Sequence, residues 1–84
     1  MKPEKLLEKL TSGSYHNVAF GDLCHLAEAF GFRLGRVRGS HHIYEHRDLP
    51  IRLNLQDWRG QGKPYQIRQL LALAEEYSLT LERR

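Results

Sequence analysis

The chain has 84 residues, of which 40% are hydrophobic, and a formal net charge of +3 at pH 7. This length suits one small domain with one core, and no apolar run approaches the ~20 residues that span a bilayer. The single cysteine, Cys24, cannot form an internal disulfide, which suits a reducing compartment. We therefore expect a single cytoplasmic domain over residues 1–84 that does not enter a membrane.

The first two elements are predicted to be helices. Residues 3–10 begin with a proline, which suits a first helical turn, and their leucines fall at helical spacing: Leu6, Leu7 and Leu10. The Thr-Ser-Gly-Ser stretch at 11–14 ends this helix. A second helix is expected over residues 20–30, stopped by Gly31. Its apolar stripe consists of Leu23, Leu26, Ala27 and Phe30.

After Gly31 the hydrophobic period changes from helical to alternating, which predicts three strands. They are expected over residues 32–38, 41–46 and 51–56, with a tight turn or bulge at Gly39 and Ser40. The third strand alternates cleanly and puts its apolar residues on one face: Ile51, Leu53 and Leu55. Pro64 then opens a last helix that runs to about Tyr77. Its buried stripe is expected to be Ile67, Leu70, Leu71 and Ala74.

This order predicts an α+β fold, α-α-β-β-β-α, in which a three-stranded antiparallel meander is covered on one face by helices. Its last five elements have the order of a double-stranded-RNA-binding domain, although order alone does not prove function. We expect residues 19–78 to form the core of the domain and residues 1–18 to be an N-terminal helical extension.

Positive charge is concentrated in the middle of the chain. Between positions 33 and 68 there are eight basic residues: Arg33, Arg36, Arg38, Arg47, Arg52, Arg59, Lys63 and Arg68. The acidic residues in the same span are three: Glu45, Asp48 and Asp57. A basic segment suits a protein that binds the phosphate backbone of a nucleic acid, and a solvated basic face explains the charge equally well.

The segment RGSHHIYEH, residues 38–46, departs from strand alternation. Neither face of this strand is purely apolar. One face would bury His41 and Glu45, and the other would bury the polar groups of His42, Tyr44 and His46. Departures of this kind are expected at functional or strained sites. Histidine titrates near neutrality and can take the proton of a ribose 2′-hydroxyl, so a histidine beside cations is enough for RNA cleavage without a metal. The cations here are Arg36, Arg38 and Lys63, and Ser40 is placed to orient a ring or bind a phosphate.

Other readings of the same residues stay open. His42 and His46 share a strand face and would need a further ligand to hold a metal, and no zinc-type spacing is present. Cys24 lies on the apolar stripe of its helix and is expected in the core. Tyr44 has two possible roles, as a base-stacking ring or as part of the core. Trp58 either packs over the core edge or stacks on a base or a partner side chain.

The motif and its setting resemble a known family. The stretch GFRLGRVRGSHHIYEH is similar to the core of HicA-family toxins, in which Gly-Phe, a basic strand and Gly-Ser-His-His recur. The resemblance extends from about Leu23 to Tyr77 and includes GKPYQIRQLLAL, which is similar to the closing helix of that fold. The lead-in SGSYHNVAFGDLCHLAEAFGF resembles a longer subgroup with an added N-terminal helix. The chain departs from the usual pattern at Arg47 and in the link NLQDWRGQGKP.

The resemblance implies a double-stranded-RNA-binding-like fold and mRNA interferase activity. It implies that His41 is the active histidine, with His42 as the alternate. It also implies that Gly39 and Ser40 shape the turn that presents this histidine. The implied partner is a HicB antitoxin, which covers the RNA surface and is often also a DNA-binding repressor. No cofactor and no metal are implied.

We therefore expect a metal-independent mRNA endoribonuclease with His41, His42 and Ser40 at its catalytic site. The residues expected to contact RNA are Arg36, Arg38, Gly39, Tyr44 and Lys63. The alternative is a non-catalytic module of the same fold that reads A-form shape and 2′-hydroxyls. A third class is an interaction protein whose basic face binds an acidic partner.

Overall fold

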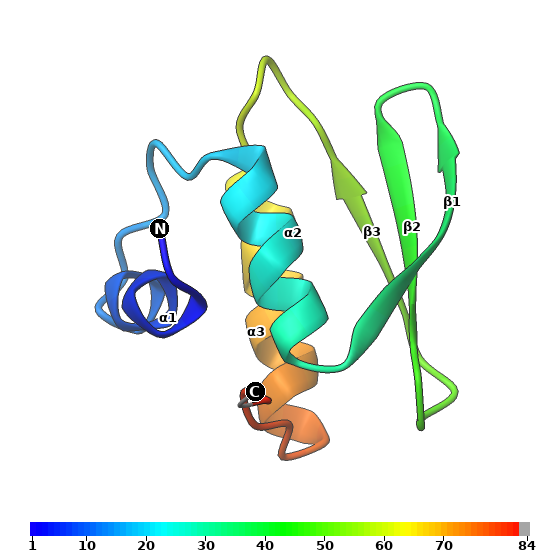
Figure 1. Cartoon of the computed structure of the whole chain (residues 1–84). Coiled ribbons are helices and arrows are strands. Elements are labelled where there is room, and N and C mark those ends of the chain that lie inside the picture. Colours follow the sequence, from blue (N-terminus) through cyan, green and yellow to red (C-terminus); the bar gives the residue numbers. More distant parts are fainter. Residues whose placement is uncertain (83–84) are drawn as a thin grey trace.

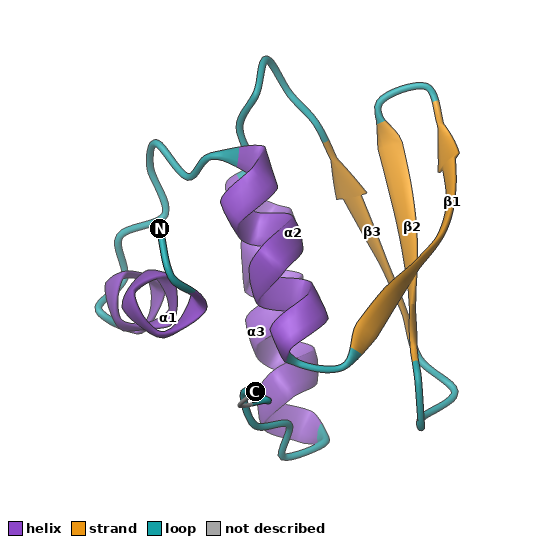
Figure 2. Cartoon of the chain, in the orientation of Figure 1, coloured by secondary structure: helices purple, strands orange, loops and turns teal. Residues whose placement is uncertain are grey.

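The computed structural model describes residues 1–82. Its elements, in chain order, are α1 (Pro3–Thr11), α2 (Phe20–Ala29), β1 (Phe32–Arg38), β2 (His41–His46), β3 (Arg52–Gln56) and α3 (Pro64–Glu76). The predicted α+β class and element order are confirmed (Figure 2). The predicted bounds hold for β1 and β2 and differ by one residue at an end of each other element. No helix within residues 1–82 is long and apolar enough to cross a membrane.

The molecule has three layers (Figure 1). The sheet has the strand order β1-β2-β3 with antiparallel neighbours, as a meander requires. One face of the sheet is covered by α2, which packs on β1, and α3, which packs on β3. The helix α1 lies on the far side of this helix pair and packs on α2, so it does not cover the sheet itself.

The apolar faces expected from the sequence meet in a single core. The stripe of α2 is buried, as are Ile51, Leu53 and Leu55 around β3. On α3, Ile67, Leu70 and Ala74 are buried, whereas Leu71 is only partly buried. Gln66, a polar residue that the periodicity did not mark, is also buried, and its Oε1 accepts a 2.7 Å hydrogen bond from the backbone N–H of Gln56.

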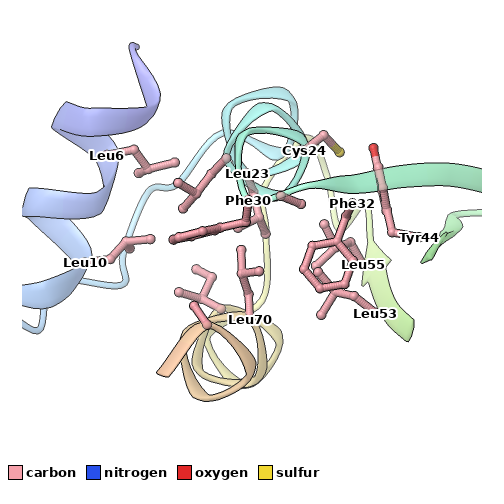
Figure 3. Packing of buried hydrophobic residues seen from close by; sticks show 14 of the residues in the cluster. Leu6, Leu10, Leu23, Cys24, Phe30, Phe32, Tyr44, Leu53, Leu55 and Leu70 are labelled. Carbon is pink, nitrogen blue, oxygen red and sulfur yellow. The ribbon is translucent and has the colours of Figure 1, made fainter. Parts of the chain in front are cut away.

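The N-terminal helix belongs to this core. Leu6 and Leu10 are 1% and 0% exposed, and they point toward Leu23 and Phe30 (Figure 3). A helix of 9 residues is marginal by itself in water, so this burial is the main source of its stability. Residues 3–11 therefore pack against the same core as the other helices.

A bulge in β1 sets which side chains face away from the helices. The register between β1 and β2 shifts between Leu34 and Arg36, so Gly35 has no partner of its own. Strict alternation from Phe32 would turn Arg36 toward the helices. Because of the extra residue, Arg36 and Arg38 pair instead with Ile43 and His41, which lie on the face that the helices do not cover. We call this uncovered side the open face.

Candidate functional site

Four segments gather at one end of the molecule, which we call the turn end (Figure 1). They are the turn Gly39–Ser40, the start of α2 at Phe20, the loop 57–62, and Lys63 at the start of α3. Backbone hydrogen bonds join them: Asp57 N–H donates to the Ser40 carbonyl at 2.8 Å, and Phe20 N–H to the Gly60 carbonyl at 2.8 Å. Both helices direct their N-termini to this end, which therefore carries positive dipole ends that favour anions.

His41 begins β2 on the open face, next to the turn. Its Nδ1 lies 3.2 Å from Oδ1 of Asn54 on β3. With the Asn54 amide in this orientation its oxygen accepts from Nδ1, and in the neutral ring the lone pair is then on Nε2. Among residues 1–82, Nε2 has no hydrogen-bond partner. The ring is thus oriented from one side and available from the other, the arrangement that a general base needs.

Arginines lie along the open face from His41 at one end of β2 to Glu45 at the other. Arg38 is its direct partner on β1, and Arg36 follows along the same face. Arg33 and Arg52 both pair with Glu45, the acidic residue between them on β2. Gly35, Arg36, Ile43, Glu45 and Arg52 line a shallow hollow here. Four arginines against one glutamate give this face an excess of positive charge suited to a polyanion.

The turn before His41 has the shape that its sequence predicts. Gly39 has a φ of +58°, a left-handed conformation that favours glycine. The Ser40 hydroxyl accepts a hydrogen bond from Gln56 Nε2 at 3.3 Å, and its carbonyl accepts from Asp57. Ser40 therefore joins the turn to the end of β3, and its carbonyl lies 3.4 Å from Nδ1 of His42.

His42 lies on the opposite side of β2 from His41, against the helices. Its ring centroid is 4.8 Å from that of Phe20, in an edge-on arrangement at 66°. Both histidines of the motif are partly buried, but the structure places them on opposite faces: His41 is on the open face across from Arg38, and His42 is beside the start of α2.

Tyr44 is a component of the core, and its expected contact with RNA is wrong. It is 2% exposed, because it faces the helices opposite Leu53. Burial and a hydrogen bond with Cys24 raise the pKa of its hydroxyl (Figure 3). Cys24 is also buried in the core, which confirms its expected position, and burial raises the pKa of its thiol.

His46 is fully engaged in structural hydrogen bonds. Its Nε2 donates to the Phe30 carbonyl at 2.9 Å, and its Nδ1 accepts from the backbone N–H groups of Asp48 at 3.1 Å and Leu49 at 3.3 Å. Both nitrogens are used, so the idea that His42 and His46 together bind a metal is wrong. No group of three or more candidate ligands within residues 1–82 is placed to hold a metal ion.

The remaining predicted residues lie at the turn end rather than on the open face. Lys63 immediately precedes α3, and Arg36 pairs with Ile43 on the open face. Trp58 is 48% exposed in the loop, with the Arg59 guanidinium 5.2 Å from its ring centroid. This half-exposure is compatible with both roles expected from the sequence, packing over the core edge and stacking on a base or a partner side chain.

Two polar residues that sequence reasoning missed contribute to this site. Asn54 orients His41, and Gln56 contacts Ser40. The alternation of β3 could have predicted both residues. Because 51, 53 and 55 face into the core, positions 52, 54 and 56 face the opposite side of the sheet.

Comparison with known proteins identifies the family to which the chain belongs. Searches of curated proteins and of solved structures found no significant match. A family model described as the HicA toxin of bacterial toxin-antitoxin matches residues 20–75, from the start of α2 almost to the end of α3. The match leaves out α1 and includes the turn, both histidines and the loop that holds Trp58. Because it covers more than half of the chain, the protein belongs to the HicA toxin family, whose members are ribonucleases that act as mRNA interferases.

Proposed function

We propose that this protein cleaves mRNA without a metal ion and that His41 is the catalytic base. The observation that supports this most directly is the geometry of the His41 ring. Its Nδ1 is hydrogen-bonded to Asn54, and its Nε2 has no hydrogen-bond partner among residues 1–82. A ring held in this way needs no rearrangement before it accepts a proton.

In the proposed reaction, Nε2 of His41 removes the proton from a ribose 2′-hydroxyl. The 2′-oxygen then bonds to the adjacent phosphorus, and the bond from phosphorus to the 5′-oxygen breaks. The leaving 5′-oxygen takes a proton from the imidazolium or from water. The products are a 2′,3′-cyclic phosphate and a 5′-hydroxyl, and every atom of the nucleophile comes from the RNA.

Positive charge near His41 supports the same assignment. Arg38 lies directly across the strand pair and Arg36 next to it, where they can stabilise charge that develops on the phosphate. Lys63 and the two helix N-termini at the turn end supply further contacts for the RNA backbone. Gly39 and Ser40 serve by holding the turn that presents the histidine.

His42 is the weaker candidate for the base. Its ring packs on Phe20, and its Nδ1 faces a carbonyl. We assign it a packing role at the start of α2.

A non-catalytic RNA-binding module is the second candidate, and the basic open face alone would support it. RNA is incubated with the purified protein in a chelator, and then with His41→Ala and His42→Phe. The nuclease proposal expects cleavage by the wild type and by His42→Phe, and loss of cleavage with binding kept in His41→Ala. An RNA with a single 2′-deoxy position at the cut site should remain whole.

Other results separate the candidates. RNA binding without cleavage in all three proteins supports the binding module. No affinity for RNA even at low salt, where phosphate contacts are strongest, contradicts both and favours an acidic protein partner.

A HicB-type antitoxin and mRNA are the partners that family membership implies. We propose that such an antitoxin covers the open face around His41 and that the protein acts in the cytoplasm. Addition of the antitoxin should then abolish cleavage and protect the arginines of the open face from chemical modification.

A further inference from the structure

We propose that Trp58 is a platform on which a base of the RNA stacks, beside the cleavage site. The ligand is a single-stranded nucleotide next to the cut bond. This inference rests on the proposed ribonuclease function and adds a recognition site to it.

The first support is exposure of aromatic surface at one end of the molecule. Trp58 is 48% exposed, and Tyr65, in the first turn of α3, is 56% exposed. Both belong to segments that meet at the turn end. Stacking on aromatic rings beside basic groups is the usual way in which proteins bind single-stranded RNA, and it tolerates any base because every base has a π-face.

The second support is the rigidity of the loop that carries the indole. Trp58 N–H donates to the Gln61 carbonyl and Gln61 N–H to the Trp58 carbonyl, both at 3.0 Å. The Asp57 carboxylate accepts from the Gly60 N–H at 2.7 Å, which closes the loop on itself. A ring on a backbone held in this way loses little conformational freedom when a ligand binds.

The third support is the position of Trp58 relative to His41. The hydrogen bond from Asp57 N–H to the Ser40 carbonyl, at 2.8 Å, ties the loop to the turn. Trp58 follows the donor residue of this bond, and His41 follows its acceptor residue. The backbone of the loop that carries the indole is therefore tied directly to the turn that presents His41, and we infer that a nucleotide whose ribose reaches His41 has its neighbour at this loop.

Local charge favours a nucleotide over an apolar protein segment as the occupant. The Arg59 guanidinium lies 5.2 Å from the Trp58 ring centroid, and Lys63 follows in the same segment. The acidic residue of this loop is Asp57, and the two cations outnumber its single negative charge. Arg59 has a φ of +53°, a strained conformation for a residue with a side chain, and it carries its guanidinium to the indole.

The experiment uses the intrinsic fluorescence of the protein, because Trp58 is the only tryptophan in the chain. A 2′-O-methyl oligonucleotide, which cannot be cut through a 2′-hydroxyl, is titrated into the wild-type protein. We expect saturable quenching of the indole emission. A series of oligonucleotides with one abasic position each should lose the quenching at one position next to the cut bond.

Variants then measure the contribution to affinity. Trp58→Ala should weaken RNA binding by about 5-fold to 100-fold, the range for loss of one stacked base, and Trp58→Phe should keep most of the affinity. Tyr77→Ala is the matched control, because Tyr77 is also an exposed aromatic, at 40%, but follows the opposite end of α3. Its RNA affinity should equal that of the wild type.

Two results would overturn this inference and leave the nuclease proposal standing. One is RNA that is bound and cut while the emission is unchanged and Trp58→Ala matches the wild type. The other is a Trp58→Ala variant with unchanged RNA affinity but weakened binding to a HicB-type antitoxin, which would place the indole in a protein interface. Failure of the wild type to bind or cut any RNA would instead contradict the proposed function, and the stacking site with it.

Discussion

Nδ1 of His41 and Oδ1 of Asn54 lie 3.2 Å apart across β2 and β3, and this contact leaves Nε2 of the imidazole without a hydrogen-bond partner among residues 1–82. Neither residue is next to the other in the chain, and they are not direct partners in the strand register. A side-chain hydrogen bond between two strands thus selects the nitrogen that can act as a base.

Asn54→Ala should therefore lower the rate of RNA cleavage by about tenfold, the equivalent of one neutral hydrogen bond, without changing RNA affinity. Asn54→Asp keeps the acceptor and should restore most of the rate. Its negative charge also favours the imidazolium, so the rise of the pH–rate profile should move to higher pH. A profile that is the same in all three proteins would show that Asn54 does not orient the base.

His46 should be a stability residue and not a catalytic one. His46→Ala leaves the Phe30 carbonyl and the N–H groups of Asp48 and Leu49 without their partner, so we expect a loss of about 3 kcal/mol in the free energy of unfolding. Urea denaturation measures this loss. His25→Ala, at an exposed position on α2, is the control and should change stability by less than about 0.5 kcal/mol. An unchanged unfolding midpoint in His46→Ala would contradict the hydrogen-bond assignment.

The helix α1 should unfold together with the rest of the domain, although it lies outside the family match. Leu6→Ala and Leu10→Ala each remove a buried side chain, and each should cost about 3 kcal/mol. Glu8→Ala, on the exposed face of the same helix, should be nearly neutral. A separate early transition for α1 in circular dichroism would show instead that the helix is only loosely attached.

The Cys24–Tyr44 contact should make the protein sensitive to alkali. Burial raises the pKa of both groups above their ordinary values of 9.0 and 10.0, so the folded protein holds these protons more tightly than the unfolded chain. The stability they contribute is complete below pH 9 and is lost as the pH rises beyond the ordinary values. Unfolding midpoints between pH 7 and pH 11 should show this decline. Tyr44→Phe removes one of the two groups and should make the decline shallower.

Sequence by itself determined the order of the elements and most of their inward faces. Local physics is enough for this: proline opens α1 and α3, a glycine follows α2, and the periods of 3.6 and 2 mark the buried stripes. The basic character of the middle segment and the Gly-Ser-His-His step could also be recognised from the sequence, because both depend only on residue type.

Only the tertiary structure decided which residues share a surface. The bulge at Gly35 turns Arg36 and Arg38 to the side of His41, whereas strict alternation puts them on the other side. Packing against α2 and α3 chose Tyr44 for the core and took His46 into hydrogen bonds with the end of α2. These outcomes depend on strand register and on contacts between distant segments, and a local period carries no information about either.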